Sequence, residues 1–161
     1  MKATLSLVIM AREPIPTWYF VLVAVRRDDR FLLVHERQHG QMWYLPAGRV
    51  EEGEELLQAA HRETLEESGI PITINGVIRI EHSLSSFGAR LRVILAASPA
   101  DDTPLKCEPD EHTLGALWVT MKDLDDLPLR SNEVRHIFRY LDDGGVVYPL
   151  TLLTGEGAPF V

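Results

Sequence analysis

Residues 48–70 read GRVEEGEELLQAAHRETLEESGI. Within this stretch, Gly53 separates a short loop from an uninterrupted run of helix-forming residues, and Gly69, followed by a proline, is typical of the end of a helix. The glutamates that follow Gly53 suit the positive end of a helix dipole. We therefore predict a helix from Glu54 to Ser68 that is entered from a loop over residues 48–53.

The predicted helix carries a cluster of carboxylates. Glu63, Glu66 and Glu67 stand at positions i, i+3 and i+4, so they lie within an arc of about 100° on one face. Like charges at this spacing destabilise a helix by about 0.2–0.5 kcal/mol per pair unless a cation neutralises them. Carboxylate oxygens select hard cations such as Mg²⁺ or Mn²⁺. For three glutamates alone, a solvated acidic face is the ordinary alternative.

The other faces of the helix suggest how it is held. Leu57, Ala60 and Thr64 form a stripe that can pack on a β-sheet. Ala59 lies one turn before the carboxylates on their own face, where its small side chain leaves room for ions and phosphate. Arg62 stands beside the carboxylates, where its guanidinium group could orient a carboxylate or hold the preceding loop.

The flanking segments have the composition of β-strands. Thr17–Arg26 and Arg30–Glu36 are rich in β-branched, aromatic and aliphatic residues, and the polar residues between them predict a hairpin. The predicted elements after the helix are, in order, strands over Ile72–Glu81, Phe87–Ser98 and Leu117–Thr120, a helix over Asn132–Leu141 capped by Ser131, and a last strand over Val146–Leu153. This order favours a mixed sheet covered by helices on both faces.

Size and composition are those of one globular domain. The chain has 161 residues, of which 45% are hydrophobic and 25% charged. We expect a single domain over residues 1–161, with a core over about 17–142 and a C-terminal strand and tail over 146–161. The lone Cys107 cannot form an internal disulfide, and no apolar stretch is long enough to span a membrane. These features favour a cytoplasmic protein.

The charge balance restricts the class of partner. The formal net charge is −8 and Lys and Arg are not clustered, so the chain lacks the basic surface that binds nucleic acid polymers. A small phosphorylated nucleotide, carried in with a divalent cation, is compatible with this charge. The sequence leaves open whether the protein is a monomer or a homodimer.

One spacing within residues 48–70 matches a known family. It runs Gly48, five residues, Glu54, seven residues, Arg62-Glu63, two residues, Glu66-Glu67, one residue, Gly69 and an aliphatic Ile70. This pattern resembles the signature of the Nudix hydrolases, which include MutT. Residues 43–48, WYLPAG, resemble the strand that leads into that signature, and the resemblance extends over about residues 17–142. Thr64 and Ala47 depart from the residues that are usual in the family.

The resemblance implies a fold of the α/β class, an α/β/α sandwich with a mixed β-sheet between helices. It also implies that Glu63, Glu66 and Glu67, helped by the carbonyl group of Gly48, bind Mg²⁺ or Mn²⁺ bridging a diphosphate. Water then attacks phosphorus, and the cations stabilise both the attacking oxygen and the leaving charge.

Members of the family differ in the base that removes the proton from water. Glu63 and Glu66 are the candidates within the signature, with Arg62 beside them as a further catalytic residue. Glu111 is the external candidate, because relatives commonly carry an acidic residue on the corresponding loop. Its surroundings are equally those of a plain acidic loop.

Four residues outside the signature are candidates for substrate binding. Trp43 and Tyr44 adjoin the signature loop, so one of them could stack on a base, although aromatics beside a loop often belong to the core. Arg90 and Arg92 share one face of a predicted strand and could meet phosphate or base. Pairing with an acidic neighbour such as Glu81 is the competing interpretation.

The favoured substrate is a nucleoside di- or triphosphate, with oxidised guanine nucleotides included, because the WYLPAG segment and later residues resemble MutT-type members. A nucleoside diphosphate sugar or ADP-ribose pyrophosphatase is the alternative enzyme. A catalytically silent Nudix domain that binds a nucleotide is the alternative outside enzymes, and the intact set of Arg62, Glu63, Glu66 and Glu67 argues against it.

Overall fold

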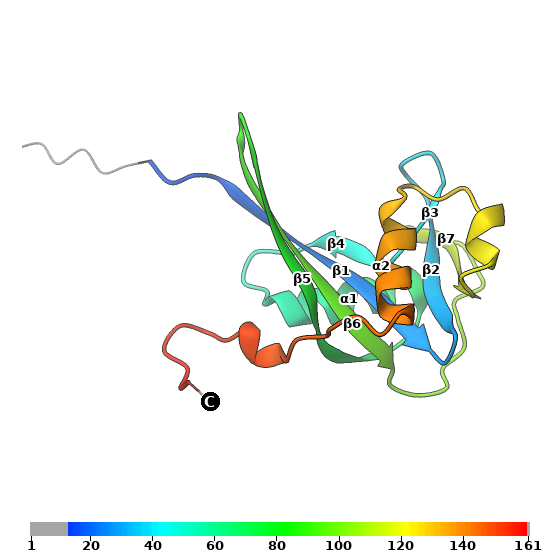
Figure 1. Cartoon of the computed structure of the whole chain (residues 1–161). Coiled ribbons are helices and arrows are strands. Elements are labelled where there is room, and N and C mark those ends of the chain that lie inside the picture. Colours follow the sequence, from blue (N-terminus) through cyan, green and yellow to red (C-terminus); the bar gives the residue numbers. More distant parts are fainter. Residues whose placement is uncertain (1–12, 161) are drawn as a thin grey trace, which may run out of the picture.

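The computed structural model describes residues 13–160 and shows a mixed β-sheet between two main helices (Figure 1). The elements are β1 (Thr17–Arg27), β2 (Arg30–Glu36), β3 (Trp43–Tyr44), β4 (Ala47–Arg49), α1 (Leu56–Ser68), β5 (Ile72–Ser85), β6 (Gly88–Pro99), β7 (Thr113–Val119) and α2 (Glu133–Asp142), with short 3-10 helices at Asp123–Asp126 and Leu150–Leu152. None of the helices within this part of the chain is long and apolar enough to cross a membrane.

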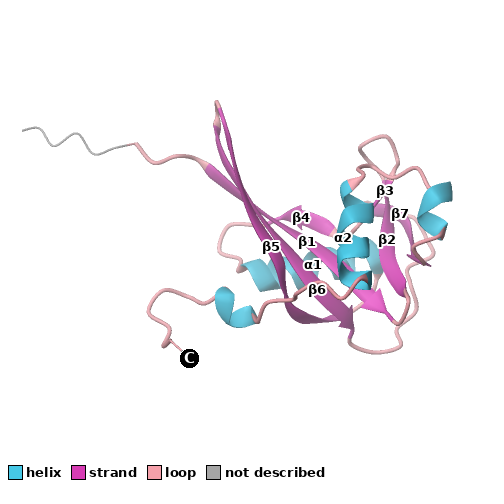
Figure 2. Ribbon diagram, in the orientation of Figure 1, coloured by secondary structure: helices cyan, strands magenta, loops and turns pink. Residues whose placement is uncertain are grey.

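Strand β1 organises the sheet. The order is β3-β2-β1-β6-β5, with β4 also paired to β1 and β7 to β2. Along one edge, β1 runs parallel to β6. Along the other edge it pairs antiparallel with β4 near its start and with β2 at its end. The β5–β6 hairpin is long and projects beyond the body of the sheet (Figure 2).

Alternating side chains give the sheet two buried faces. In β1, Val21, Val23 and Val25 belong to the core on the α1 side, whereas Leu22 and Ala24 belong to the core on the α2 side. This alternation follows from the two-residue period of a strand. Because each face is covered by a helix, the predicted α/β/α sandwich with a mixed sheet is confirmed.

The ends of the helices follow the capping residues. Helix α1 begins at Leu56 instead of Glu54, because Glu55 is its N-cap and exchanges capping hydrogen bonds with Gln58. It ends at Gly69 as predicted, with the glycine in the left-handed region at φ +76°. Helix α2 begins one residue later than predicted, and its N-cap is Asn132 instead of the predicted Ser131. The hydroxyl of Ser131 accepts a hydrogen bond from the backbone N–H of Glu133 at 3.2 Å.

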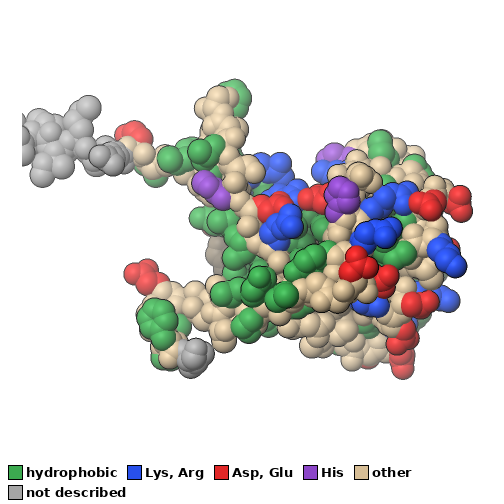
Figure 3. All heavy atoms as spheres, in the orientation of Figure 1, with side chains coloured by type: hydrophobic (Ala, Val, Ile, Leu, Met, Phe, Trp, Pro, Cys, Tyr) green, Lys and Arg blue, Asp and Glu red, His purple; other side chains and the backbone are tan. Residues whose placement is uncertain are grey.

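The predicted strand over Val146–Leu153 is wrong. Within it, Tyr148 makes a single antiparallel bridge to Val77 of β5, and residues 150–152 form a turn of 3-10 helix. After Tyr148 the backbone turns into this 3-10 helix, whose hydrogen bonds run within the segment, from Leu152 to Pro149 and from Leu153 to Leu150. The apolar side chains of this segment are therefore largely exposed, and Figure 3 shows hydrophobic surface toward the hairpin and the C-terminal segment.

Candidate active site

Arg62 fastens the loop before α1 to the carboxylate cluster. Its Nε and Nη2 atoms donate to the two carboxylate oxygens of Glu54, each at 2.8 Å, and Nη2 also donates to the carbonyl oxygen of Arg49 at 3.0 Å. Nη1 donates to Glu63 at 2.8 Å and to Glu66 at 3.3 Å. The guanidinium group thus both orients carboxylates and holds the loop, the two arrangements that its position suggested. The hydrogen bonding of Glu54 to Arg62 lowers the pKa of Glu54.

Gly48 lies directly against the carboxylate of Glu63. A Cβ atom at position 48 would stand 1.9 Å from the carboxyl carbon of Glu63, so the close approach requires a residue without a side chain. Burial raises the pKa of Glu63, and the hydrogen bond and the positive charge of Arg62 oppose that rise. The glycine of the signature is therefore explained by packing of a catalytic candidate on the backbone.

Glu67 points toward the start of β4. Its Oε2 atom accepts a hydrogen bond from the backbone N–H of Ala47 at 3.0 Å. Burial raises the pKa of Glu67 to about 8, and the nearby carboxylates of Glu63 and Glu36 add to the rise. Glu36, at the end of β2, was missed by sequence reasoning. The sequence feature that could have indicated Glu36 is its position as a charged residue at the end of an apolar strand.

The residues present fit a hard divalent cation in donor type and in charge. Glu63 and Glu67 are partly buried acids with raised pKa values, and Oε2 of Glu36 is buried without a hydrogen-bond partner. Among residues 13–160, no three side chains of the ligating types already converge on one point. The carboxylates of Glu63 and Glu66 are both held as hydrogen-bond acceptors by Nη1 of Arg62.

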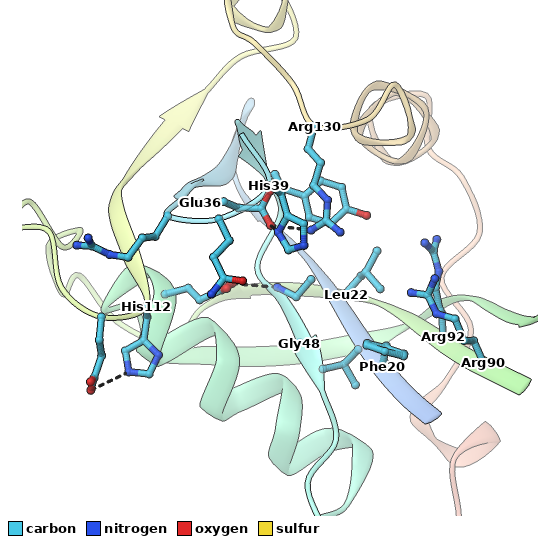
Figure 4. Close-up of a pocket in the computed structure, with 16 residues that line it drawn as sticks. Phe20, Leu22, Glu36, His39, Gly48, Arg90, Arg92, His112 and Arg130 are labelled. Carbon is cyan, nitrogen blue, oxygen red and sulfur yellow. Dashed lines mark hydrogen bonds and ion pairs between the residues drawn. The ribbon is translucent and has the colours of Figure 1, made fainter. Parts of the chain in front are cut away.

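A cavity of about 440 Å³ opens beside these carboxylates (Figure 4). Among the residues predicted for the site, those that line the cavity are Tyr44, Gly48, Glu67, Arg90, Arg92 and Glu111. Glu63 lies behind Gly48, and Arg62 and Glu66 lie along α1 outside the cavity lining. Ala59 is fully buried in the core on the α1 side, so the expectation that it leaves open space for ions is wrong.

Neither predicted aromatic offers a free ring to a substrate. Trp43 lies outside the cavity lining and stacks on the ring of His35, with the ring centroids 4.5 Å apart. Tyr44 is 6% exposed, and its hydroxyl donates to Glu133 at 2.7 Å. Burial and the bond to Glu133 raise the pKa of Tyr44. The interpretation that these aromatics belong to the core is the one that the structure favours.

The two arginines of β6 differ in their partners. Arg92 pairs with Glu81 of β5 at 2.7 Å, which is the predicted cross-strand pairing, and also with Glu133 of α2. The guanidinium carbon of Arg90 lies 4.6 Å from the ring centroid of Phe20. Within the described residues, Arg90 has no carboxylate in ion-pair range, so its charge remains free at the cavity.

Glu111 stands at the rim of the cavity and its side chain is 88% exposed. The neighbouring His112 lies between two acids, with Nε2 3.6 Å from Glu111 and Nδ1 3.8 Å from Glu66. The loop after β6 therefore brings the external candidate to the same side of the molecule as the carboxylates of α1.

Comparison with known proteins identifies the family. The family model for the NUDIX domain matches residues 17–141 of this chain. The chain belongs to the Nudix family. A NUDIX hydrolase from Nitrosomonas europaea shares this fold, with a TM-score of 0.73 and 25% sequence identity, over 89% of this Nudix chain and 100% of that one.

Two curated relatives show the range of the Nudix family. The human 8-oxo-dGDP phosphatase NUDT18 is 34% identical over 124 residues, which are 74% of this chain and 37% of the relative. The NAD-capped RNA hydrolase NudC of Pasteurella multocida is 51% identical over 53 residues, which are 32% of this chain and 20% of the relative. The Nudix chain thus spans only about a third or less of the length of these relatives.

Proposed function

We propose that this Nudix chain hydrolyses a diphosphate bond of a nucleoside di- or triphosphate, with oxidised guanine nucleotides among its substrates. The observation that carries the proposal is the position of partly buried carboxylates beside a cavity that is lined by arginines. The likeness to NUDT18 over 74% of the chain supports an oxidised guanine diphosphate. The match to NudC covers too little of the chain to favour its substrate.

Nudix hydrolases generally use divalent cations, and we propose Mg²⁺ or Mn²⁺ here. Glu63, Glu66 and Glu67, with the carbonyl oxygen of Gly48, are the proposed ligands. When bound, the cation would polarise the diphosphate and lower the pKa of water. Arg62 positions Glu63 and Glu66 for this task, because its guanidinium group already contacts both.

The proposed bases are Glu63 and Glu66 within the signature and Glu111 at the rim. A general base must reach the water molecule from which it takes the proton. Glu111 lines the cavity, Glu66 lies 3.8 Å from His112 of the cavity lining, and the carboxylate of Glu63 lies against Gly48, which also lines the cavity. We propose that Arg90 contacts the phosphates, because among residues 13–160 it is the arginine of β6 at the cavity that has no carboxylate partner. Arg92 is neutralised by Glu81 and Glu133 and supports the cavity wall.

Replacing Gly48 with Ala tests the proposed ligand arrangement. The added methyl group would displace the flexible end of Glu63, so the protein is expected to remain folded. Its affinity for Mn²⁺ is expected to fall by at least about tenfold, measured by calorimetric titration. Gly155→Ala, at a position with no atom within 4 Å of the added carbon, is the matched control. An unchanged Mn²⁺ affinity in Gly48→Ala would contradict the arrangement.

A substrate panel tests the proposed function as a whole. Nucleoside diphosphates, nucleoside triphosphates, 8-oxoguanine nucleotides, nucleoside diphosphate sugars and ADP-ribose are incubated with Mg²⁺ or Mn²⁺, and the products are separated by chromatography. We expect the highest kcat/KM with a guanine di- or triphosphate. Preferred turnover of a diphosphate sugar or ADP-ribose would favour the alternative enzyme, and no turnover with retained nucleotide binding would favour a silent binding domain.

A further inference from the structure

The planar group that faces the cavity near Tyr44 is the guanidinium of Arg130. The central carbon of this group lies 4.7 Å from the ring centroid of Tyr44. The guanidinium group therefore covers the Tyr44 ring, which the sequence had suggested as a stacking surface. The Arg130 side chain is 36% exposed, whereas Tyr44 is 6% exposed. A base that entered this part of the cavity would therefore meet Arg130 before it met Tyr44.

Arg130 is held in place at its backbone and at its guanidinium group. Its backbone N–H donates to the carbonyl oxygen of Trp43 at 3.0 Å, and the N–H of Trp43 donates to Pro128 at 2.9 Å. The guanidinium group donates from Nη1 to Oε1 of Glu36 at 2.6 Å. Figure 4 shows Arg130 entering from the segment before α2, whereas Arg90 and Arg92 enter from β6. The guanidinium plane is thus fixed before any ligand arrives.

Arg130 and Arg90 differ in whether a carboxylate neutralises their charge. The charge of Arg130 is neutralised by Glu36, whose side chain is 13% exposed, so Arg130 is a poor attractor for phosphate. Its planar, weakly hydrated face remains suited to an aromatic ring. Arg90 keeps a free charge and suits phosphate better.

Glu36 fixes the guanidinium group of Arg130 to the wall of the cavity. Its Oε1 atom accepts the hydrogen bond from Arg130, and the Glu36 side chain itself lines the cavity. Its Oε2 atom is enclosed by the protein, so it does not face a ligand in the cavity. The contact that Arg130 offers to a nucleobase is therefore the planar face of its guanidinium group.

We propose that Arg130, positioned by Glu36 and Tyr44, is the residue on which the nucleobase of the substrate stacks. This inference rests on the proposed nucleotide substrate. Arg130 then replaces Trp43 and Tyr44 as the stacking candidate, and Glu36 becomes a positioning residue for base recognition.

The test is Arg130→Lys, which keeps the charge opposite Glu36 and so protects the fold, but removes the planar group. We expect KM for a guanosine diphosphate substrate to rise by about 5- to 30-fold, with kcat changed less than about twofold. Binding of GMP, measured by calorimetry, should weaken by the same factor, while binding of ribose 5-phosphate should not change. Arg26→Lys is the matched control, because Arg26 also lies over a ring, that of Phe31, and pairs with Asp142 away from the cavity.

The outcomes separate this inference from the proposed function. Equal GMP affinity and equal KM in wild type and Arg130→Lys, with normal turnover, would overturn stacking on Arg130 and leave the enzyme assignment intact. A parallel loss of GMP and ribose 5-phosphate binding would also overturn it, because the contact would then be to phosphate. Absent turnover with GMP binding that depends on Arg130 would support the stacking and reject the enzyme.

Discussion

Glu66→Gln and Glu67→Gln are each expected to lower metal-dependent turnover by at least about 100-fold. Removing residues that only support metal ligands costs about 10- to 100-fold in other proteins, and these carboxylates are proposed as ligands themselves. A neutral amide cannot replace the charge of a carboxylate on a hard cation. The measurement is kcat with the best nucleotide of the panel at saturating Mg²⁺.

The fold should survive both substitutions. Gln at position 67 can still accept the hydrogen bond from the backbone N–H of Ala47, and it removes a buried acid. Glu52→Gln, at an exposed position in the signature loop, is the matched control and should retain full activity. Unchanged Mg²⁺-dependent turnover in both Glu66→Gln and Glu67→Gln would contradict the assignment of the carboxylates.

Local patterns predicted most of the fold because the deciding interactions are close in sequence. The β1–β2 hairpin is closed by a short polar turn, and Gly69 ends α1 through its own left-handed backbone. The apolar run of Val146–Leu153 also resembles a strand, but strand formation depends on a partner edge. In this run only Tyr148 pairs with β5, and residues 150–152 turn into a 3-10 helix, which the hydrophobic residues alone did not indicate.

The candidate site, like the fold, has a part that local sequence patterns predict and a part that they do not. The spacing of Glu63, Glu66 and Glu67 is a property of one helix, so it could be predicted from the sequence. The pair formed by Glu36 and Arg130 joins residues 94 positions apart, and no local pattern relates them. Covering of Tyr44 by Arg130 likewise depends on how the segment before α2 pairs with β3.

The stability of the metal-free protein is expected to fall as pH rises from about 5 to about 8. Burial raises the pKa of Glu67 to about 8, so the folded protein retains a proton that the unfolded chain releases near the ordinary pKa of a glutamate. The folded state then binds more protons than the unfolded state across this window, and the free energy of unfolding decreases with pH. Each unit of pH contributes up to about 1.4 kcal/mol.

Urea unfolding in EDTA at pH 5.5, 6.5 and 7.5 measures this effect, and Glu67→Gln isolates it from other titrating groups. The free energy of unfolding of the wild type should decrease relative to that of Glu67→Gln as pH rises. The lowered pKa of Asp110 has the opposite sign, but its contribution changes only below this window. Mg²⁺ should reverse the loss, because a bound cation stabilises the ionised carboxylate. A difference that stays constant with pH would mean that Glu67 is ionised in the folded protein without metal, and that its charge is already compensated by the residues around it.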